Sequence, residues 1–275
     1  MASCNHRCSE CQHHCSSKMP EKAPINRGSS IRHVIGVVSG KGGVGKSLIS
    51  CLLASIFAKK GYKTGVLDAD ITGPSVPHAF GLSGLQIEGD GFGMIPVESR
   101  GGVKMISVNL LVEEESKPVL LRGAAISATV KQFWSEVPWG ELDFLFIDMP
   151  PGTGDVPLTV YQNIPLDGIV VVGSPQGLVS MIVKKAIHMA ERMDVKLLGL
   201  VENMSYVSCP DCGKRMYLYG EGKTRALAES FGVPCLAELP IDPAIALAVD
   251  EGRLEEADLS FAADLFQNLS AQLSL

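Results

Sequence analysis

The 275-residue sequence has no hydrophobic run of the roughly 20 residues that a membrane-spanning helix needs. Its longest apolar runs, such as 168–173, have the length of buried strands. The first residues are polar and contain no apolar segment, so no secretory signal peptide is expected. An excess of positive charge is also missing. The net charge of −6 and the pI of about 5.5 argue against a nucleic-acid-binding or membrane-binding surface.

The composition allows one sizeable α/β domain, because 46% of the residues are hydrophobic and 20% are charged. Strand and helix patterns alternate, which predicts a doubly wound, mostly parallel sheet. The expected strands span 34–39, 64–68, 103–108, 144–148, 168–173, 196–202 and 235–239, and the expected helices span 47–60, 127–134, 177–192, 223–231, 243–250 and 261–272. Eight cysteines without an export signal indicate thiols or metal ligands in a reducing compartment, so we expect a cytoplasmic protein.

An octapeptide between the first expected strand and helix fits the phosphate-binding pattern G-x-x-x-x-G-K-[ST]; it consists of Gly40, Lys41, Gly42, Gly43, Val44, Gly45, Lys46 and Ser47. Backbone N–H groups of such a turn surround a phosphate, and the helix N-terminus adds partial positive charge. Lys46 is expected to reach the β- and γ-phosphates, and the Ser47 hydroxyl to bind Mg²⁺. The alternative is a glycine-rich turn without a ligand, which the complete motif in this context disfavours.

Carboxylates follow two other expected strands. Asp68 and Asp70 end the second strand, and Asp148 ends the strand 144–148. Ligands of parallel sheets bind beyond the carboxyl ends of the strands, so these acids are expected near the phosphates. Asp148 fits a carboxylate that holds Mg²⁺, and the turn with Pro151 and Gly152 suits a switch that moves when the γ-phosphate leaves. Each acid alone would fit a helix cap or a solvated turn, but together with the phosphate loop they predict a nucleotide site.

Lys41 is a second lysine that an ordinary phosphate loop does not need. The form G-K-G-G-V-G-K-S resembles the deviant Walker A loop of the family that includes MinD, ParA and the nitrogenase iron protein. The resemblance implies an ATPase that forms a homodimer, in which Lys41 reaches the nucleotide of the partner. It also implies that Lys46 is catalytic, that Asp70 positions or deprotonates the attacking water, and that Asp68 supports the Mg²⁺ shell. Asn203 matches the family position that contacts adenine.

Cys209 and Cys212 form a C-x-x-C turn, a spacing at which two thiolates hold one metal centre. Lys214 is expected to favour the thiolate form. The domain has no second C-x-x-C, so four thiolates require two copies of the chain across a twofold axis. Such a site fits a bridging [4Fe–4S] cluster or a structural Zn²⁺. A redox role is a third reading, although redox C-x-x-C motifs belong at a helix start in a thioredoxin-like unit.

Four segments together resemble the Mrp/Nbp35 (ApbC-type) iron–sulfur cluster carriers: V-E-N-M-S at 201–205, the cysteine turn, G-E-G at 220–222 and P-I-D-P at 240–243. The resemblance covers about residues 31–252 and implies an ATP-dependent scaffold that binds a labile [4Fe–4S] cluster and passes it to apoprotein acceptors. Lys223 departs from the glycine that the family more often has there. Cys51 and Cys235 fit small core residues.

The N-terminus carries Cys4, Cys8, Cys11 and Cys15, whose thiolates are close enough to surround one [4Fe–4S] cluster or one Zn²⁺. The Nbp35 branch of the family has an N-terminal four-cysteine motif with wider spacing, so a metal-loading arm and a disordered metal-scavenging tail remain alternatives. We therefore divide the chain into a Cys-rich extension over 1–15, a linker over 16–30 and a P-loop ATPase domain over 31–275, with the cluster loop at 209–212.

A spatial regulator of the MinD or ParA type, with structural Zn²⁺ at the cysteines, is the alternative function. MinD types end in a basic amphipathic helix, whereas residues 261–275 contain no Lys or Arg. ParA types need a basic DNA-binding face, and neither type has a use for Cys209 and Cys212. In an electron-transfer reductase like the nitrogenase iron protein, the cluster ligands come singly from separate loops. The sequence therefore favours a cluster carrier that hydrolyses ATP slowly and binds neither nucleic acid nor membrane.

Overall fold

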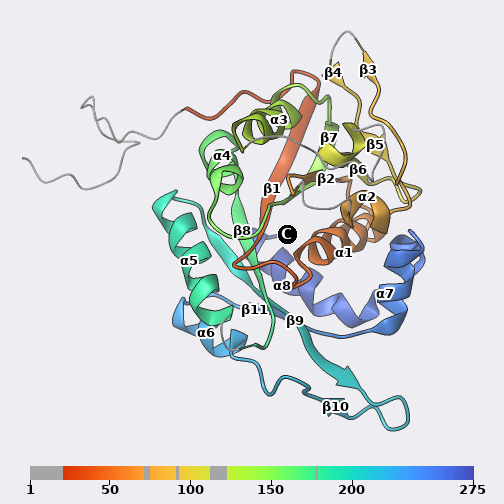
Figure 1. Cartoon of the computed structure of the whole chain (residues 1–275), viewed down its shortest axis with the longest axis vertical. Helices are drawn as coiled ribbons and strands as arrows, with labels where there is room; N and C mark the ends of the chain where they lie inside the picture. The colour runs from red at the N-terminus through yellow and green to blue at the C-terminus, as the bar shows by residue number, and fades with distance from the viewer. Residues whose placement is uncertain (1–20, 71–74, 91–92, 112–122, 177–178) are drawn as a thin grey trace, which may run out of the picture.

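The computed structural model describes residues 21–70, 75–90, 93–111, 123–176 and 179–275 (Figure 1). Within these ranges nine strands form one sheet, with the order β10-β9-β8-β1-β7-β2-β6-β5 and with β11 paired to β9. The strands are β1 (Ser29–Ser39), β2 (Thr64–Asp68), β5 (Val97–Glu98), β6 (Lys104–Ser107), β7 (Gly140–Asp148), β8 (Gly168–Gly173), β9 (Leu197–Ser208), β10 (Arg215–Met216) and β11 (Cys235–Pro240). A separate hairpin pairs β3 (Gly89–Asp90) with β4 (Gly93–Met94).

The centre of the sheet is parallel. β1 lies between β7 and β8, β2 pairs with β7 and β6, and β9 pairs with β8 and β11, all in parallel. Only the short strands β5 and β10, at the two ends of the order, pair antiparallel within the described sheet. The central strands are rich in Val, Ile and Leu because both of their faces are covered. The doubly wound, mostly parallel fold expected from the sequence is therefore confirmed.

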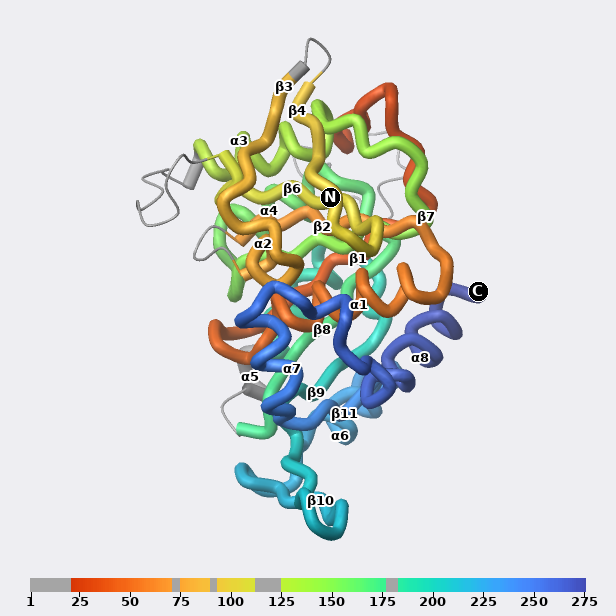
Figure 2. The backbone as a smooth tube through the Cα atoms, turned by 90° about the vertical axis from the view of Figure 1, so that its right-hand side faces the viewer, coloured from red at the N-terminus to blue at the C-terminus, as the bar shows by residue number. Residues whose placement is uncertain are grey.

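Helices cover both faces of the sheet, as Figures 1 and 2 show. One hydrophobic cluster joins one sheet face to α1 (Lys46–Lys59), α2 (Ser75–Ala79), α7 (Pro243–Asp250) and α8 (Ala263–Leu273). The second cluster joins the other face to α3 (Gly123–Ser135), α4 (Asp155–Asn163), α5 (Val179–Arg192) and α6 (Thr224–Ser230). Short 3₁₀ turns complete the described chain at η2 (Val108–Leu111), η3 (Leu254–Glu256) and η4 (Ser260–Ala262).

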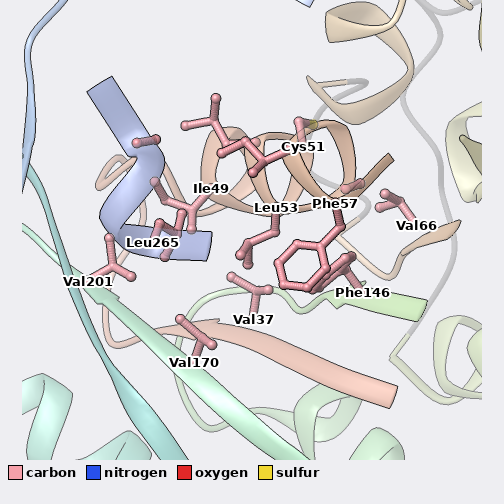
Figure 3. Close-up of a cluster of buried hydrophobic side chains, with 14 of the residues drawn as sticks. Val37, Ile49, Cys51, Leu53, Phe57, Val66, Phe146, Val170, Val201 and Leu265 are labelled. Atoms are coloured by element: carbon pink, nitrogen blue, oxygen red, sulfur yellow. The ribbon is translucent and has the colours of Figure 1, made fainter. Parts of the chain in front are cut away.

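Helix α1 is the central element of the first layer. Ile49, Leu53 and Phe57 are fully buried, and Figure 3 shows them above Val37 of β1 and Phe146 of β7. Burying a side chain of this size contributes about 1.5–3 kcal/mol, so this packing fixes the helix on the sheet. The N-terminus of α1 is thereby held at the carboxyl ends of β1 and β7, where the phosphate loop lies.

Several elements were not expected from the sequence. α2, α4 and the strands β3, β4, β5 and β10 are additions, and β1, β7, β9 and α3 extend beyond their expected ranges. Part of the expected linker 16–30 also lies on the domain, because Ala23 is buried and β1 begins at Ser29. The backbone N–H of Ala23 donates to the carbonyl of Asn163 at 2.8 Å. Among the described helices, none is both long and apolar enough to cross a membrane.

Candidate nucleotide site and cysteine loop

The phosphate loop follows β1 directly and ends at the first turn of α1, as the sequence predicts. Gly43 and Gly45 adopt left-handed backbone conformations, with φ of 77° and 80°. Such angles suit glycine and aim consecutive N–H groups inward. The loop borders a cleft of about 350 Å³, which is also lined by Lys46, Ser47, Asp70 and Pro151. Residues from several loops at the carboxyl ends of the strands therefore meet in one cleft.

Lys46, Ser47 and Asp148 form a compact polar centre at the base of this cleft. Lys46 Nζ lies 2.8 Å from Asp148 Oδ2 and 3.4 Å from Asp70 Oδ2. The Ser47 hydroxyl donates to Asp148 Oδ2 at 2.6 Å. Burial lowers the pKa of Lys46, but the charges of Asp148, Asp70 and Asp68 outweigh it and raise the pKa above its usual value. Lys46 is therefore a fixed positive charge beside the cleft.

Asp68 lies next to this centre but interacts differently. It is the register partner of Asp148 on adjacent strands, and both are buried. The Ser107 hydroxyl donates to Asp68 Oδ2 at 2.7 Å, and the backbone N–H of Asp70 donates to Oδ1 at 3.0 Å. Burial and the nearby charge of Asp148 raise the pKa of Asp68 well above its usual value. Asp68 thus acts as an anchor behind the cleft, with its oxygens occupied by protein donors.

The donor set at Ser47 and Asp148 fits Mg²⁺, a hard cation that prefers oxygen ligands. One hydroxyl and one carboxylate converge there from two different elements, α1 and β7. In the structure, Asp148 Oδ2 accepts from Lys46 Nζ at 2.8 Å, and the motif assigns this lysine to the phosphates. These residues are therefore the ones that would hold Mg²⁺ beside a bound triphosphate.

The turn after β7 packs on the phosphate loop. The backbone N–H of Gly152 donates to the carbonyl of Ser39 at 2.9 Å, and a Cβ at Gly42 would lie 4.0 Å from Pro151. Lys41 lies at the rim, where its ammonium donates to Gln176 Oε1 at 2.7 Å. The Pro151–Gly152 turn therefore lies against the end of β1 and the phosphate loop.

Asn203 lies against the phosphate loop from β9. Its side-chain amide is buried and donates to the carbonyl of Val44 at 3.0 Å. A Cβ at Gly45 would lie 2.1 Å from the Asn203 amide nitrogen, so the two residues fit only because position 45 has no side chain. The residue that the family resemblance assigned to adenine therefore contacts the backbone of the loop itself.

The cysteine turn follows β9, and Figures 1 and 2 show the β10 segment extending away from the body of the molecule. Two backbone bonds close the turn, from Gly213 N–H to the Cys209 carbonyl and from Cys209 N–H to the Lys214 carbonyl, both at 2.9 Å. Cys209 is partly exposed and Cys212 is exposed, and both are free thiols. The turn therefore presents two accessible thiols on one short loop.

The backbone N–H groups of Cys212 and Asp211, followed by the Cys212 side chain, lower the pKa of Cys209. Lys214, which the sequence suggested for this effect, is not among its causes. Burial and the charge of Glu238 instead raise the pKa of Cys235 to about 11, and burial raises that of Cys51 as well. The Cys209 thiol is therefore deprotonated more readily than an ordinary thiol, whereas the thiols of Cys51 and Cys235 are deprotonated less readily.

Glu202 connects the end of this loop to β9. Its carboxylate is buried and accepts from the Ser205 hydroxyl at 2.7 Å and from the Thr224 N–H at 3.3 Å. Met204, which lies between Glu202 and Ser205 in the sequence, has a left-handed backbone (φ 58°). Gly222 lies so close to the carboxylate that a Cβ there would overlap it. The segment that returns from the cysteine loop is therefore held at β9, next to Asn203.

Four consecutive large apolar residues beyond the cysteines are 40 to 61% exposed: Met216, Tyr217, Leu218 and Tyr219. Arg215 lies over the Tyr206 ring at 4.3 Å, which ties the base of this segment to β9. We call residues 215–219 the apolar arm. Contiguous exposed apolar side chains are typical of surfaces that contact another molecule.

Some of the predictions made from the sequence are not tested by the described residues. Cys4, Cys8, Cys11 and Cys15 lie in residues 1–20, outside the described ranges. In the described part of the chain, no group of three or more His, Cys, Asp or Glu side chains is placed to hold a metal ion. Sequence reasoning missed Ser50, Ser107, Gln176 and Glu202. Single Ser, Gln and Glu residues carry no local signature, and only the fold shows their partners.

Comparison with known proteins agrees with this geometry. The ParA family model described as NUBPL iron-transfer P-loop NTPase matches residues 30–274. An iron–sulfur cluster carrier protein of Clostridium perfringens is 47% identical over 249 residues, covering 88% of this chain and 87% of the relative. The cytosolic Fe-S cluster assembly factor CFD1 of Kluyveromyces lactis is 41% identical and covers 78% of each chain.

Solved structures give the same result. A nucleotide-binding protein from Archaeoglobus fulgidus in complex with ADP is 44% identical, with a TM-score of 0.76, and the match covers 86% of this chain and 91% of the other. The MinD cell division protein of Aquifex aeolicus has a TM-score of 0.61 at 20% identity, covering 88% and 97%, which shows a shared fold. Because the family model spans residues 30–274 and the relatives match over most of their length, the chain belongs to the ParA-type family of iron-transfer P-loop NTPases that includes the iron–sulfur cluster carriers.

Proposed function

We propose that this chain is an ATP-hydrolysing carrier that binds a labile [4Fe–4S] cluster between two copies of itself and passes it to apoprotein acceptors. The observation that carries the proposal is the pair of accessible thiols, Cys209 and Cys212, on a loop that grows out of the strand contacting the phosphate loop. The names of the relatives, which are cluster carriers and assembly factors, support it.

Two copies are needed because each loop supplies two thiols, whereas a [4Fe–4S] cluster has four thiolate ligands. In a twofold dimer the same surface meets itself, so the apolar arms of both copies would approach each other beside the cluster. Their exposed side chains would then be covered, which supports this arrangement. The hydrogen bonds that lower the pKa of Cys209 favour the thiolate form, which is the form that binds a cluster.

At the nucleotide site, Lys46 would neutralise the β- and γ-phosphates, and Ser47 with Asp148 would hold the Mg²⁺ that accompanies ATP. That ion would supply charge stabilisation at the transferring phosphoryl group. Asp70, 3.4 Å from Lys46, would orient the attacking water, and Lys41 would reach the nucleotide of the partner. A cycle of this kind suits a reducing compartment such as the cytoplasm, where thiolate ligands persist.

The nucleotide state would affect the cluster through β9. Asn203 contacts the phosphate loop, and the next residue toward the N-terminus, Glu202, holds the segment that returns from the cysteine loop. A shift of the loop on nucleotide exchange would therefore change how firmly the two cysteine turns hold a shared cluster. By linkage, cluster binding would then also change nucleotide affinity.

Replacing Cys212 by Ser tests the carrier proposal. A chain that begins at Glu21 is reconstituted anaerobically with iron and sulfide, so that only the described cysteines contribute. The unsubstituted chain is expected to hold one four-iron cluster per two chains and to transfer it to an apo-ferredoxin-type acceptor. Cys212→Ser is expected to lose the cluster and its transfer while still binding ATP, because the phosphate loop lies on other elements.

The matched control is Cys235→Ser, which makes the same chemical change at a half-buried cysteine of β11. It should leave iron content unchanged. A Cys212→Ser protein that retains and transfers a full cluster would refute the proposal. Preferential retention of one Zn²⁺ per two chains, with no cluster transfer, would instead favour a MinD-like or ParA-like regulator with a structural zinc site.

A further inference from the structure

Three donors converge on the buried carboxylate of Asp148. Lys46 Nζ and Ser47 Oγ contact Oδ2, at 2.8 and 2.6 Å. Ser50 Oγ contacts the other oxygen, Oδ1, at 2.6 Å. All three donors come from the first two turns of α1, while Asp148 ends β7. Both carboxylate oxygens are thus occupied, each from a defined side.

The three donors differ in what else they can bind. Lys46 and Ser47 line the cleft and are the groups assigned to the phosphates and Mg²⁺, so these ligands compete with Asp148 for them. Ser50 has no exposed surface and does not line the cleft. A ligand in the cleft therefore has no direct access to the Ser50 hydroxyl.

The Ser50 hydroxyl has one proton and two acceptors within reach. The carbonyl of Lys46, one turn back on α1, lies at 3.3 Å, and Asp148 Oδ1 lies at 2.6 Å. A short bond to a charged oxygen is about twice as strong as a bond to a neutral carbonyl. The proton therefore points to Asp148, and the hydroxyl sets the rotation of the carboxylate.

We propose that Ser50 is the positioning residue for Asp148. Its hydroxyl holds Oδ1, which leaves Oδ2 directed at Ser47 and at the Mg²⁺ position when Lys46 and Ser47 turn to the nucleotide. The inference rests on the ATP-hydrolysing half of the proposed function and is independent of the cysteine loop. A failure here therefore leaves the cluster test untouched, and the reverse holds as well.

Ser55 provides a matched control on the same helix. It is 1% exposed, and its hydroxyl has no hydrogen-bond partner among the residues that the structure describes. Ser55→Ala therefore removes a buried hydroxyl from α1 without removing a donor from a carboxylate. Any general effect of deleting a serine hydroxyl from this helix should appear in both alanine variants.

The test compares Ser50→Ala, Ser50→Cys and Ser50→Thr in the full chain. Alanine removes the donor, cysteine keeps the shape with a much weaker donor, and threonine keeps the hydroxyl. Equilibrium binding of a fluorescent ADP analogue is titrated with Mg²⁺, which needs no turnover, and ATP hydrolysis is measured in parallel. Thermal unfolding verifies that each variant is folded.

Loss of a residue that orients a metal ligand typically costs 10–100-fold in metal affinity or activity. Ser50→Ala is therefore expected to need at least about tenfold more Mg²⁺ for half-saturation and to hydrolyse ATP at least about tenfold more slowly. Its affinity for the analogue in EDTA should be unchanged. Threonine should restore the Mg²⁺ response, cysteine should resemble alanine, and Ser55→Ala should match the unsubstituted chain.

Three results would overturn the inference. The first is a Ser50→Ala chain with the original Mg²⁺ response and turnover. The second is a response that follows side-chain volume, with the Cys variant normal and the Ala and Thr variants both impaired. In that second case Ser50 would serve packing alone. A general loss of stability shared with Ser55→Ala would assign the effect to the helix and likewise reject a positioning role.

Discussion

At Gly45 the phosphate loop leaves no room for a side chain. Its φ of 80° is unfavourable for other residues, and a Cβ there would lie 2.1 Å from the Asn203 amide nitrogen. Gly43 has nearly the same φ, 77°, but a Cβ at that position would meet nothing within 4 Å. Substitutions at Gly43 and Gly45 therefore distinguish two contributions to stability: the free-energy cost of the left-handed backbone and the cost of displacing Asn203.

We predict that Gly45→Ala destabilises the fold more than Gly43→Ala. The left-handed conformation should lower the free energy of unfolding of both variants by about 1–2 kcal/mol. Gly45→Ala should lower it by about 1–3 kcal/mol more, because the buried Asn203 amide loses its hydrogen bond to the Val44 carbonyl. Urea unfolding without nucleotide gives both values. Equal losses in the two variants would show that the Asn203 contact contributes little to stability.

Individual site residues could be predicted from the sequence where they belong to a motif. The positions of Lys46, Ser47 and Asp148 follow from a phosphate loop beside a parallel strand, and the structure brings all three within hydrogen-bonding distance. The donors behind them did not follow. Ser50 and Ser107 reach Asp148 and Asp68 because of how α1 and β6 pack on the sheet, and nothing in the neighbouring residues encodes that packing.

The segment that enters β1 is part of the folded domain. Ala23 is buried, and its carbonyl accepts from the Trp134 indole N–H at 2.9 Å. Lys22 donates to the carbonyl of Tyr161 in α4. Ser29 adds a hydroxyl that accepts from the Trp139 N–H at 2.8 Å. Residues 21–29 therefore join α3, α4 and β7.

We predict that a chain beginning at Glu21 is as stable as the full chain, whereas one beginning at Ser30 is less stable. The shorter chain leaves the buried Trp134 N–H without its acceptor, which costs about 1–3 kcal/mol. Urea unfolding followed by tryptophan fluorescence measures this difference. If both truncated chains unfold at the same urea concentration, the entry segment lies on the domain without stabilising it.

Among the elements, the central strands were predicted to within a few residues because strands buried on both faces form continuous apolar runs. Helix α4 was missed, since it is short, begins after Gly154 and carries Pro157 in its first turn. The pairing of β9 with β10 was missed because β10 is only two residues long and both residues are exposed, so it has no apolar pattern. Segments whose structure depends on neighbours give weak periodic signals.

For the whole molecule, the proposed dimer places Lys41 and Lys46 in different sites. Lys46 would act on the nucleotide of its own chain and Lys41 on that of the partner. Within one chain, the Lys41 ammonium donates to the Gln176 side chain. The alternative is that Lys41, held by Gln176, acts on the nucleotide bound to its own chain.

We predict that Lys41→Ala and Lys46→Ala each lose ATP hydrolysis, by about 10²–10³-fold in rate. An equimolar mixture of the two variants should recover about a quarter of the original activity, because half of the dimers are mixed and each has one complete site. Gln176→Ala, which keeps the Lys41 ammonium, should remain active. A mixture as inactive as its components would reject action across the dimer.

Strand β9 also fixes the number of residues between the phosphate-loop contact and the cysteine turn. Asn203 at the phosphate loop and Cys209 at the tip belong to one continuous run of chain, and side chains along a strand alternate between faces. Inserting or deleting one residue between Ser205 and Ser208, beyond the left-handed backbone of Met204, would turn the thiols to the opposite side and leave the phosphate loop unchanged. A chain altered in this way could not align its thiols with those of an unaltered copy. In the proposed dimer, the spacing of these two residues would thus decide which related chains are able to share one cluster.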